Sequence, residues 1–152
     1  MMTLANLHTA VQTTLASKRL GKPVFVRYLL QGSDKVEAIP GRLAQITLVV
    51  QEWLGQPLER IYAVGSADSG QVSLTLQFRE GATAQVTFVR GQPRGSGVDL
   101  MVLGNHGAIY HDAGSAGLWD EAAAALPDRP DPVVKEAIER ALRSGKPEGL
   151  KP

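Results

Sequence analysis

The stretch VSLTLQFREGATAQVTF (residues 72–88) carries the clearest structural pattern in the chain. Apolar and uncharged polar residues alternate along it, and this period of two is typical of strands with one buried face. The apolar positions are Val72, Leu74, Leu76 and Phe78, followed after Gly81 by Ala84, Val86 and Phe88. The pattern predicts strands over 71–80 and 83–91, joined at Gly81 as an antiparallel hairpin.

Working outward, the flanking segments predict further strands and helices. Strands are expected over 24–30, 58–66, 98–105 and 107–112, and the segment 31–41 is expected to be a loop. Helices are expected over 4–19, from Pro40 or Gly41 to Leu54, over 118–126, and from an Asp131 cap to Gly145. This order predicts an α+β fold: an open, mainly antiparallel sheet of about six strands with helices packed on one face.

Composition limits the classes of function. The 152 residues fit a single domain (1–152), and 43% hydrophobic residues can build a core. A net charge of +1 argues against nucleic acid or an acidic membrane as a partner. The chain has no cysteine, no secretory signal pattern and no apolar run of membrane-spanning length, so we expect a soluble, cytoplasmic protein.

The outward face of the central hairpin is polar but carries no charge. Its predicted members are Gln71, Ser73, Thr75, Gln77, Thr83, Gln85 and Thr87. An ordinary solvated sheet face is one interpretation. Because charged residues are depleted at the centres of interfaces, we favour a protein interface, with a second copy of the chain as the expected partner.

Five stretches, in order along nearly the whole chain, resemble the C-terminal domain of the Gfo/Idh/MocA oxidoreductases. They are LASKRLGKPVFVRYLL (15–30), QEWLGQPLERIYAVGS (51–66), VSLTLQFREGATAQVTF (72–88), MVLGNHGAIYHD (101–112) and PVVKEAIERALRSGKP (132–147). The resemblance implies an open sheet with helices on one side. It also implies that the free sheet face packs against another subunit, as in many members of the family.

Motifs of the complete oxidoreductases are missing. The sequence has no Gly-x-Gly-x-x-Gly for a dinucleotide and no Glu-Lys-Pro, the motif that carries the family's usual catalytic lysine. No third ligand follows His111 and Asp112 at a spacing that suits a metal. We therefore expect no metal and no cofactor bound by this chain alone.

The helix over 41–54 lacks the catalytic residues that the resemblance implies. In catalytic members it reads roughly D-x-G-x-H-x-x-D before its terminator, and its His and an Asp form a proton relay. Aligning the terminator on Trp53-Leu54-Gly55 places Gln45 at the His position. Since residues 41–55 contain no His and no Asp, and Gln does not titrate, we expect no catalytic residue here.

Arg27 and Arg42 are candidate ligand contacts, together with Gln45. Arg27 is predicted to lie within a buried strand, and Arg42 opens the second helix. The resemblance places both near the cleft where a family member holds its sugar, and a buried Arg needs a partner such as a bound acid. An internal salt bridge to Asp34 or Glu37 is the alternative.

These observations lead to two functional hypotheses. The first is a stand-alone, non-catalytic relative of the oxidoreductase C-terminal domain that forms a homodimer or binds a partner or small ligand. The alternative is a substrate-domain subunit that complements a separate Rossmann-domain protein in an NAD(P)-dependent sugar oxidoreductase.

Overall fold

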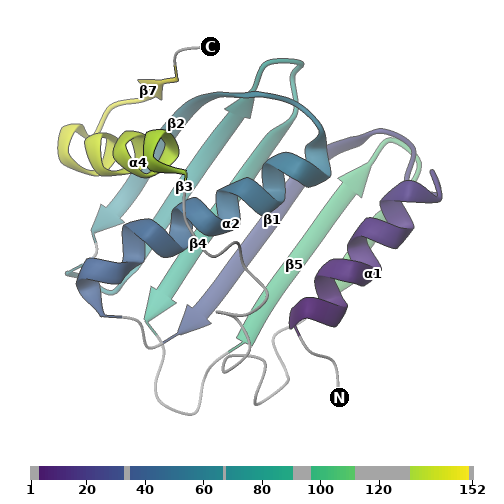
Figure 1. Cartoon of the computed structure of the whole chain (residues 1–152), viewed down its shortest axis with the longest axis horizontal. Coiled ribbons are helices and arrows are strands. Elements are labelled where there is room, and N and C mark those ends of the chain that lie inside the picture. Colours follow the sequence, from purple (N-terminus) through teal and green to yellow (C-terminus); the bar gives the residue numbers. More distant parts are fainter. Residues whose placement is uncertain (1–3, 33–34, 67, 91–96, 112–130, 151–152) are drawn as a thin grey trace.

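The computed structural model describes residues 4–32, 35–66, 68–90, 97–111 and 131–150. These residues form one sheet with helices against it (Figure 1). The elements, in order, are α1 (Leu4–Ala16), β1 (Pro23–Gly32), the 3-10 turn η1 (Val36–Ala38), α2 (Ile39–Leu54), β2 (Leu58–Ser66), β3 (Gln71–Phe78), β4 (Thr83–Arg90), β5 (Gly97–Gly104), β6 (Ala108–His111), α4 (Pro132–Ser144) and β7 (Glu148–Gly149).

The sheet has seven strands in the order β6-β5-β1-β4-β3-β2-β7. Its neighbours are antiparallel except for β1 and β4, which run parallel. The α+β class and the mainly antiparallel sheet are therefore confirmed. The additional strand is β7, a two-residue segment paired with β2 that was too short to show a pattern.

The β3–β4 hairpin is confirmed with its predicted faces. Leu74 pairs with Val86 and Leu76 with Ala84, and all four side chains are buried. Gly81 provides the turn with a φ of 100°, a backbone conformation that glycine adopts without strain.

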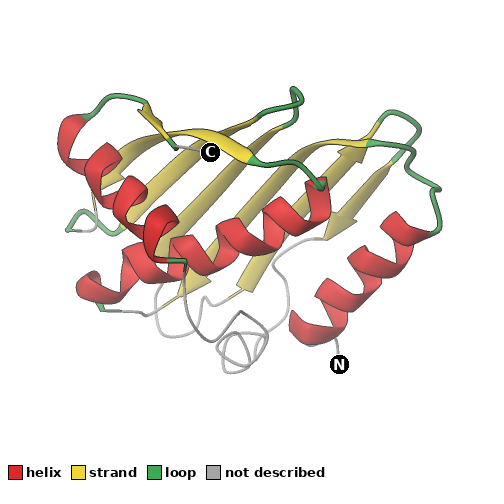
Figure 2. Cartoon of the chain, turned by 45° about the horizontal axis from the view of Figure 1, so that its top comes forward, coloured by secondary structure: helices red, strands yellow, loops and turns green. Residues whose placement is uncertain are grey.

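The three described helices all lie on one face of the sheet, as predicted (Figures 1 and 2). α2 crosses the middle of that face and buries nine residues, the largest number of any of them: Ile39, Leu43, Ala44, Ile46, Thr47, Val49, Val50, Trp53 and Leu54. It ends where predicted, at Gly55 in the left-handed conformation, whose N–H donates to the Gln51 carbonyl. None of the described helices is long and apolar enough to cross a membrane.

Several predicted boundaries were wrong by a few residues. α1 ends at Ala16 instead of residue 19, because Lys18 adopts a φ of 65° and turns the chain. β1 continues to Gly32, and α2 begins at Ile39, so much of the expected 31–41 loop is regular structure. Asp131 caps α4 as predicted, accepting from the Val133 N–H at 2.9 Å. The predicted helix over 118–126 lies outside the described residues.

The β5–β6 hairpin is attached to the turn between α1 and β1. The His106 N–H donates to the Leu20 carbonyl at 2.9 Å, and the Lys22 N–H donates to Asn105 Oδ1 at 2.9 Å. Gly104 lies against Leu20 at this junction. These contacts fix the β6 edge of the sheet relative to α1.

Candidate functional site

The candidate site is the sheet face opposite the helices, which we call the open face. Its side chains follow from the strand register, since directly paired residues point to the same side. One row crosses the sheet from β6 to β2; it contains Tyr110, Met101, Arg27, Gln85, Thr75 and Tyr62. A second row contains Ala108, Leu103, Phe25, Thr83, Gln77 and Arg60, and a third contains Asp99, Leu29, Thr87, Ser73 and Val64.

All seven residues predicted for the uncharged outward face lie on the open face. Gln71, Thr75, Gln77, Thr83 and Gln85 are exposed. Ser73 and Thr87 are less accessible, and their hydroxyl oxygens lie 2.9 Å apart across the β3–β4 pair. The structure therefore places these residues together, while their role as an interface stays a prediction.

The other half of the open face is apolar, which was not predicted from the sequence. β1 contributes Phe25 and Leu29, β5 contributes Met101 and Leu103, and β6 contributes Tyr110, which is 70% exposed. These strands also send apolar side chains into the core, so their sequences show apolar runs instead of alternation. Such runs are typical of strands covered on both faces.

The prediction that Arg27 is buried was wrong. Its neighbours Val26 and Tyr28 point into the core, so Arg27 points outward and is exposed on the open face. Among the described residues no carboxylate forms an ion pair with it, and Asp34 lies outside them. Asp99 and Arg60 also carry charge onto this face, so the uncharged part is limited to β3, β4 and the short β6.

A hollow of about 260 Å³ lies at the β2 side of the open face. It is lined by Arg60, Tyr62, Thr75, Gln77 and Pro147. The first four belong to β2 and β3, whereas Pro147 comes from the turn between α4 and β7.

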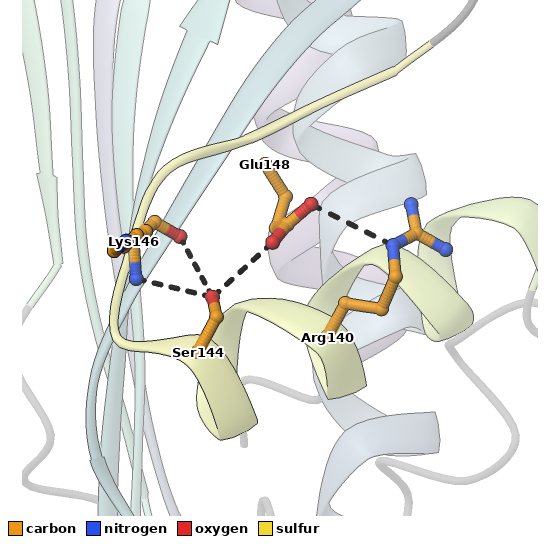
Figure 3. A network of polar contacts seen from close by, with 4 residues as sticks. All are labelled: Arg140, Ser144, Lys146 and Glu148. Carbon is orange, nitrogen blue, oxygen red and sulfur yellow. Dashed lines mark hydrogen bonds and ion pairs between the residues drawn. The ribbon is translucent and has the colours of Figure 1, made fainter.

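A polar network holds that turn in place (Figure 3). Glu148 forms an ion pair with Arg140 at 3.7 Å, and its other oxygen lies 3.2 Å from Ser144 Oγ. The Lys146 N–H donates to Ser144 Oγ at 3.1 Å. Because Lys146 and Glu148 flank Pro147, the network fixes one wall of the hollow.

The other two candidate ligand residues lie on the opposite side of the sheet. Arg42 Nη1 donates to Gln45 Oε1 at 3.2 Å, within the first turns of α2. Arg27 lies on the open face, so the three residues do not share one site. No ion pair between Arg42 and Glu37 is present among the described contacts.

Beneath α2 lies a buried aromatic cluster. The Tyr28 hydroxyl is 2.8 Å from His8 Nε2, and Trp53 packs on both rings, stacked on Tyr28 and edge-on to His8. Burial raises the pKa of Tyr28 far above its usual value, and the Arg42 charge opposes this. A phenol held neutral in this way is not available as a base.

Within the part of the chain that the structure describes, no group of three His, Asp or Glu side chains could hold a metal. His111 is half-buried at the end of β6, and Asp112 lies outside the described residues.

Solved dehydrogenase structures superpose on almost the whole chain. A myo-inositol 2-dehydrogenase from Lactobacillus plantarum matches with a TM-score of 0.70 at 14% identity, over 95% of this chain and 61% of its own. A putative myo-inositol dehydrogenase from Sinorhizobium meliloti matches with a TM-score of 0.69 at 17% identity, over 95% and 62%. The chain has the fold of these dehydrogenases.

A probable dehydrogenase from Thermotoga maritima shows the same relation, with a TM-score of 0.68 at 14% identity over 94% of this chain and 61% of its own. The chain thus spans about three fifths of these dehydrogenases. This is consistent with the C-terminal domain alone, and it confirms the predicted resemblance at the level of the fold. No protein-family model matches the sequence, and no curated protein matches it significantly.

Proposed function

We propose that this protein is a non-catalytic relative of the dehydrogenase C-terminal domain that assembles into a homodimer through its open face. The proposal rests on β1 and β5, which carry apolar side chains on both faces of the sheet. The helices that the structure describes cover one side, while Phe25, Leu29, Met101 and Leu103 point to the other. A second sheet packed on this face would remove those side chains from water.

The size of the open face suits a dimer. At the usual strand spacing and rise, the strands from β6 to β2 span about 24 Å across the sheet and about 26 Å along it. Each copy would then contribute roughly 600 Å², a total of about 1,200 Å², which is the lower limit for stable protein interfaces. The face also has few charges to desolvate, since β3 and β4 contribute none.

The non-catalytic part of the proposal rests on α2. Its residues include no His and no Asp, and Gln45 already accepts a hydrogen bond from Arg42. An amide cannot relay a proton, and the buried phenol of Tyr28 stays protonated. Neither group is a base that could take the hydroxyl proton when an alcohol is oxidised.

Sedimentation analysis over a wide dilution range tests the dimer. The wild-type chain should sediment as a dimer, and Gln85→Lys, at the centre of the open face, should shift it to monomer. Gln12→Lys is the matched control, because Gln12 is exposed on α1, on the helix side. A wild-type monomer at every concentration, or equal behaviour of the two variants, would refute the proposal.

The alternative remains a subunit that joins a separate Rossmann-domain protein. One structure with the same fold is the myo-inositol dehydrogenase from Lactobacillus casei in complex with NAD(H) and myo-inositol. The match covers 59% of that longer chain. The Arg42–Gln45 pair weighs against this alternative. It would be supported only if a Rossmann-domain protein from the same genome co-purified with this chain and the complex oxidised a sugar alcohol with NAD(P).

A further inference from the structure

We propose that in the homodimer Tyr110 of each copy inserts into the hollow lined by Arg60, Tyr62, Thr75, Gln77 and Pro147 of the other copy. This inference rests on the proposed function, since it assigns the contacts of the same open face. Tyr110 is the most exposed large hydrophobic side chain among the described residues, at 70%. The hollow and Tyr110 lie at opposite sides of one sheet face.

The strand order decides which parts of two facing copies meet. Six strands, β6-β5-β1-β4-β3-β2, form the open face, so its centre lies between β1 and β4. A twofold axis along the strands at this centre places the β6 edge of one copy over the β2 edge of the other. Because Tyr110 and Tyr62 belong to the same cross-strand row, Tyr110 then lies over the hollow of the second copy.

Two arrangements align the strands of the facing sheets, with the twofold axis either along the strands or perpendicular to them. Charge favours the axis along the strands. A twofold axis perpendicular to the strands would place β1 over β1 and bring Arg27 close to Arg27, which is unfavourable in a desolvated interface. An axis along the strands places Arg27 over Gln85, whose side-chain carbonyl can accept from a guanidinium. The perpendicular axis would also leave both hollows empty, against the close packing of interface cores.

The hollow has the size and chemistry for one tyrosine side chain. Its 260 Å³ lies below the about 300–1,000 Å³ of sites that enclose a whole small molecule. Tyr62 and Pro147 provide apolar walls for a ring, and the Arg60 guanidinium suits a ring face. Thr75 and Gln77 offer polar partners for the phenol hydroxyl, which a buried tyrosine requires.

Cross-linking of introduced cysteines tests the arrangement. No native thiol can react with the cross-linker, because the chain contains no cysteine. Tyr110→Cys and Gln77→Cys chains, distinguishable by mass, are mixed and treated with a thiol cross-linker that spans about 10 Å, the separation of packed sheets. The expected product joins one chain of each kind, whereas Gln12→Cys chains give none. Self-linking of Tyr110→Cys chains without the mixed product would overturn the arrangement.

The dissociation constant tests the contact itself. Tyr110→Ala should weaken the dimer at least tenfold, while Tyr110→Phe should weaken it less, since it keeps the ring. Circular dichroism should show both variants folded, because this side chain is largely exposed in the single chain. A wild-type monomer would refute the proposed function and this inference together. A stable wild-type dimer with an unchanged dissociation constant in Tyr110→Ala would overturn the Tyr110 contact alone.

Discussion

At the scale of single residues, Gly104 leaves no room for a side chain. A methyl group there would overlap the Leu20 carbonyl oxygen and lie 2.8 Å from its carbon. We expect Gly104→Ala to lower the free energy of unfolding by about 1–3 kcal/mol through overpacking. Urea denaturation measures this. Gly149→Ala is the control, because nothing lies within 4 Å of its added methyl group, and its effect should stay within about 0.5 kcal/mol. Equal losses in both variants would contradict the steric explanation.

Tyr28 predicts a loss of stability in alkali. Burial raises the pKa of its hydroxyl, so the folded protein binds this proton more tightly than the unfolded chain. The contribution is complete below the unfolded pKa of about 10 and falls as the pH rises above it. The urea midpoint should therefore decrease from about pH 9 to about pH 11, and less steeply in Tyr28→Phe. An identical slope in that variant would show that Tyr28 is not the cause.

Arg27 shows what a single sequence leaves undetermined at this scale. Its apolar neighbours suggested a strand buried on both faces, and with it a buried arginine. The alternation of Val26 and Tyr28 into the core was predictable. Whether the outward side chains contact a second layer was not predictable, because the described residues contain no such layer. The apolar run reflects a second, outward row of apolar side chains on β1, Phe25 and Leu29.

At the scale of elements, Gln56 ties the end of α2 to the β3–β4 turn. Its side-chain oxygen accepts from the Glu80 N–H at 3.1 Å and from the Ala82 N–H at 3.2 Å, and the residue is buried. We expect Gln56→Ala to cost about 1–3 kcal/mol, since the buried Ala82 N–H loses its acceptor. Thermal unfolding measures it against Gln12→Ala, an exposed change on α1 expected to stay within about 0.5 kcal/mol.

The same elements show how far local patterns reach. The β3–β4 hairpin and the ends of α2 and α4 were predictable, because alternation, glycine termination and the Asp131 cap are local signals. The parallel pairing of β1 with β4 was not, because it depends on residues far apart in sequence. For the same reason, the hollow beside Pro147 had no sequence signal, since three separate elements build it.

At the scale of the whole molecule, a dimer predicts that stability depends on protein concentration. Association of folded chains draws the equilibrium away from the unfolded state by mass action. The Tm should therefore rise over a hundredfold increase in concentration and stay constant in Gln85→Lys. Scanning calorimetry or fluorescence provides both curves. A wild-type Tm independent of concentration would argue against association coupled to folding.

The central position of β1 has a consequence for synthesis. Val26 pairs with Ala84 on one side and with Val102 on the other, and both partners are made much later than β1. At about 5–20 residues per second, the roughly 60 residues between Val26 and Ala84 take about 3–12 s to emerge from a ribosome. During that interval β1 has two unpaired edges and apolar side chains on both faces. β1 therefore completes its native pairing only after β5, the later of its two neighbours, has been made.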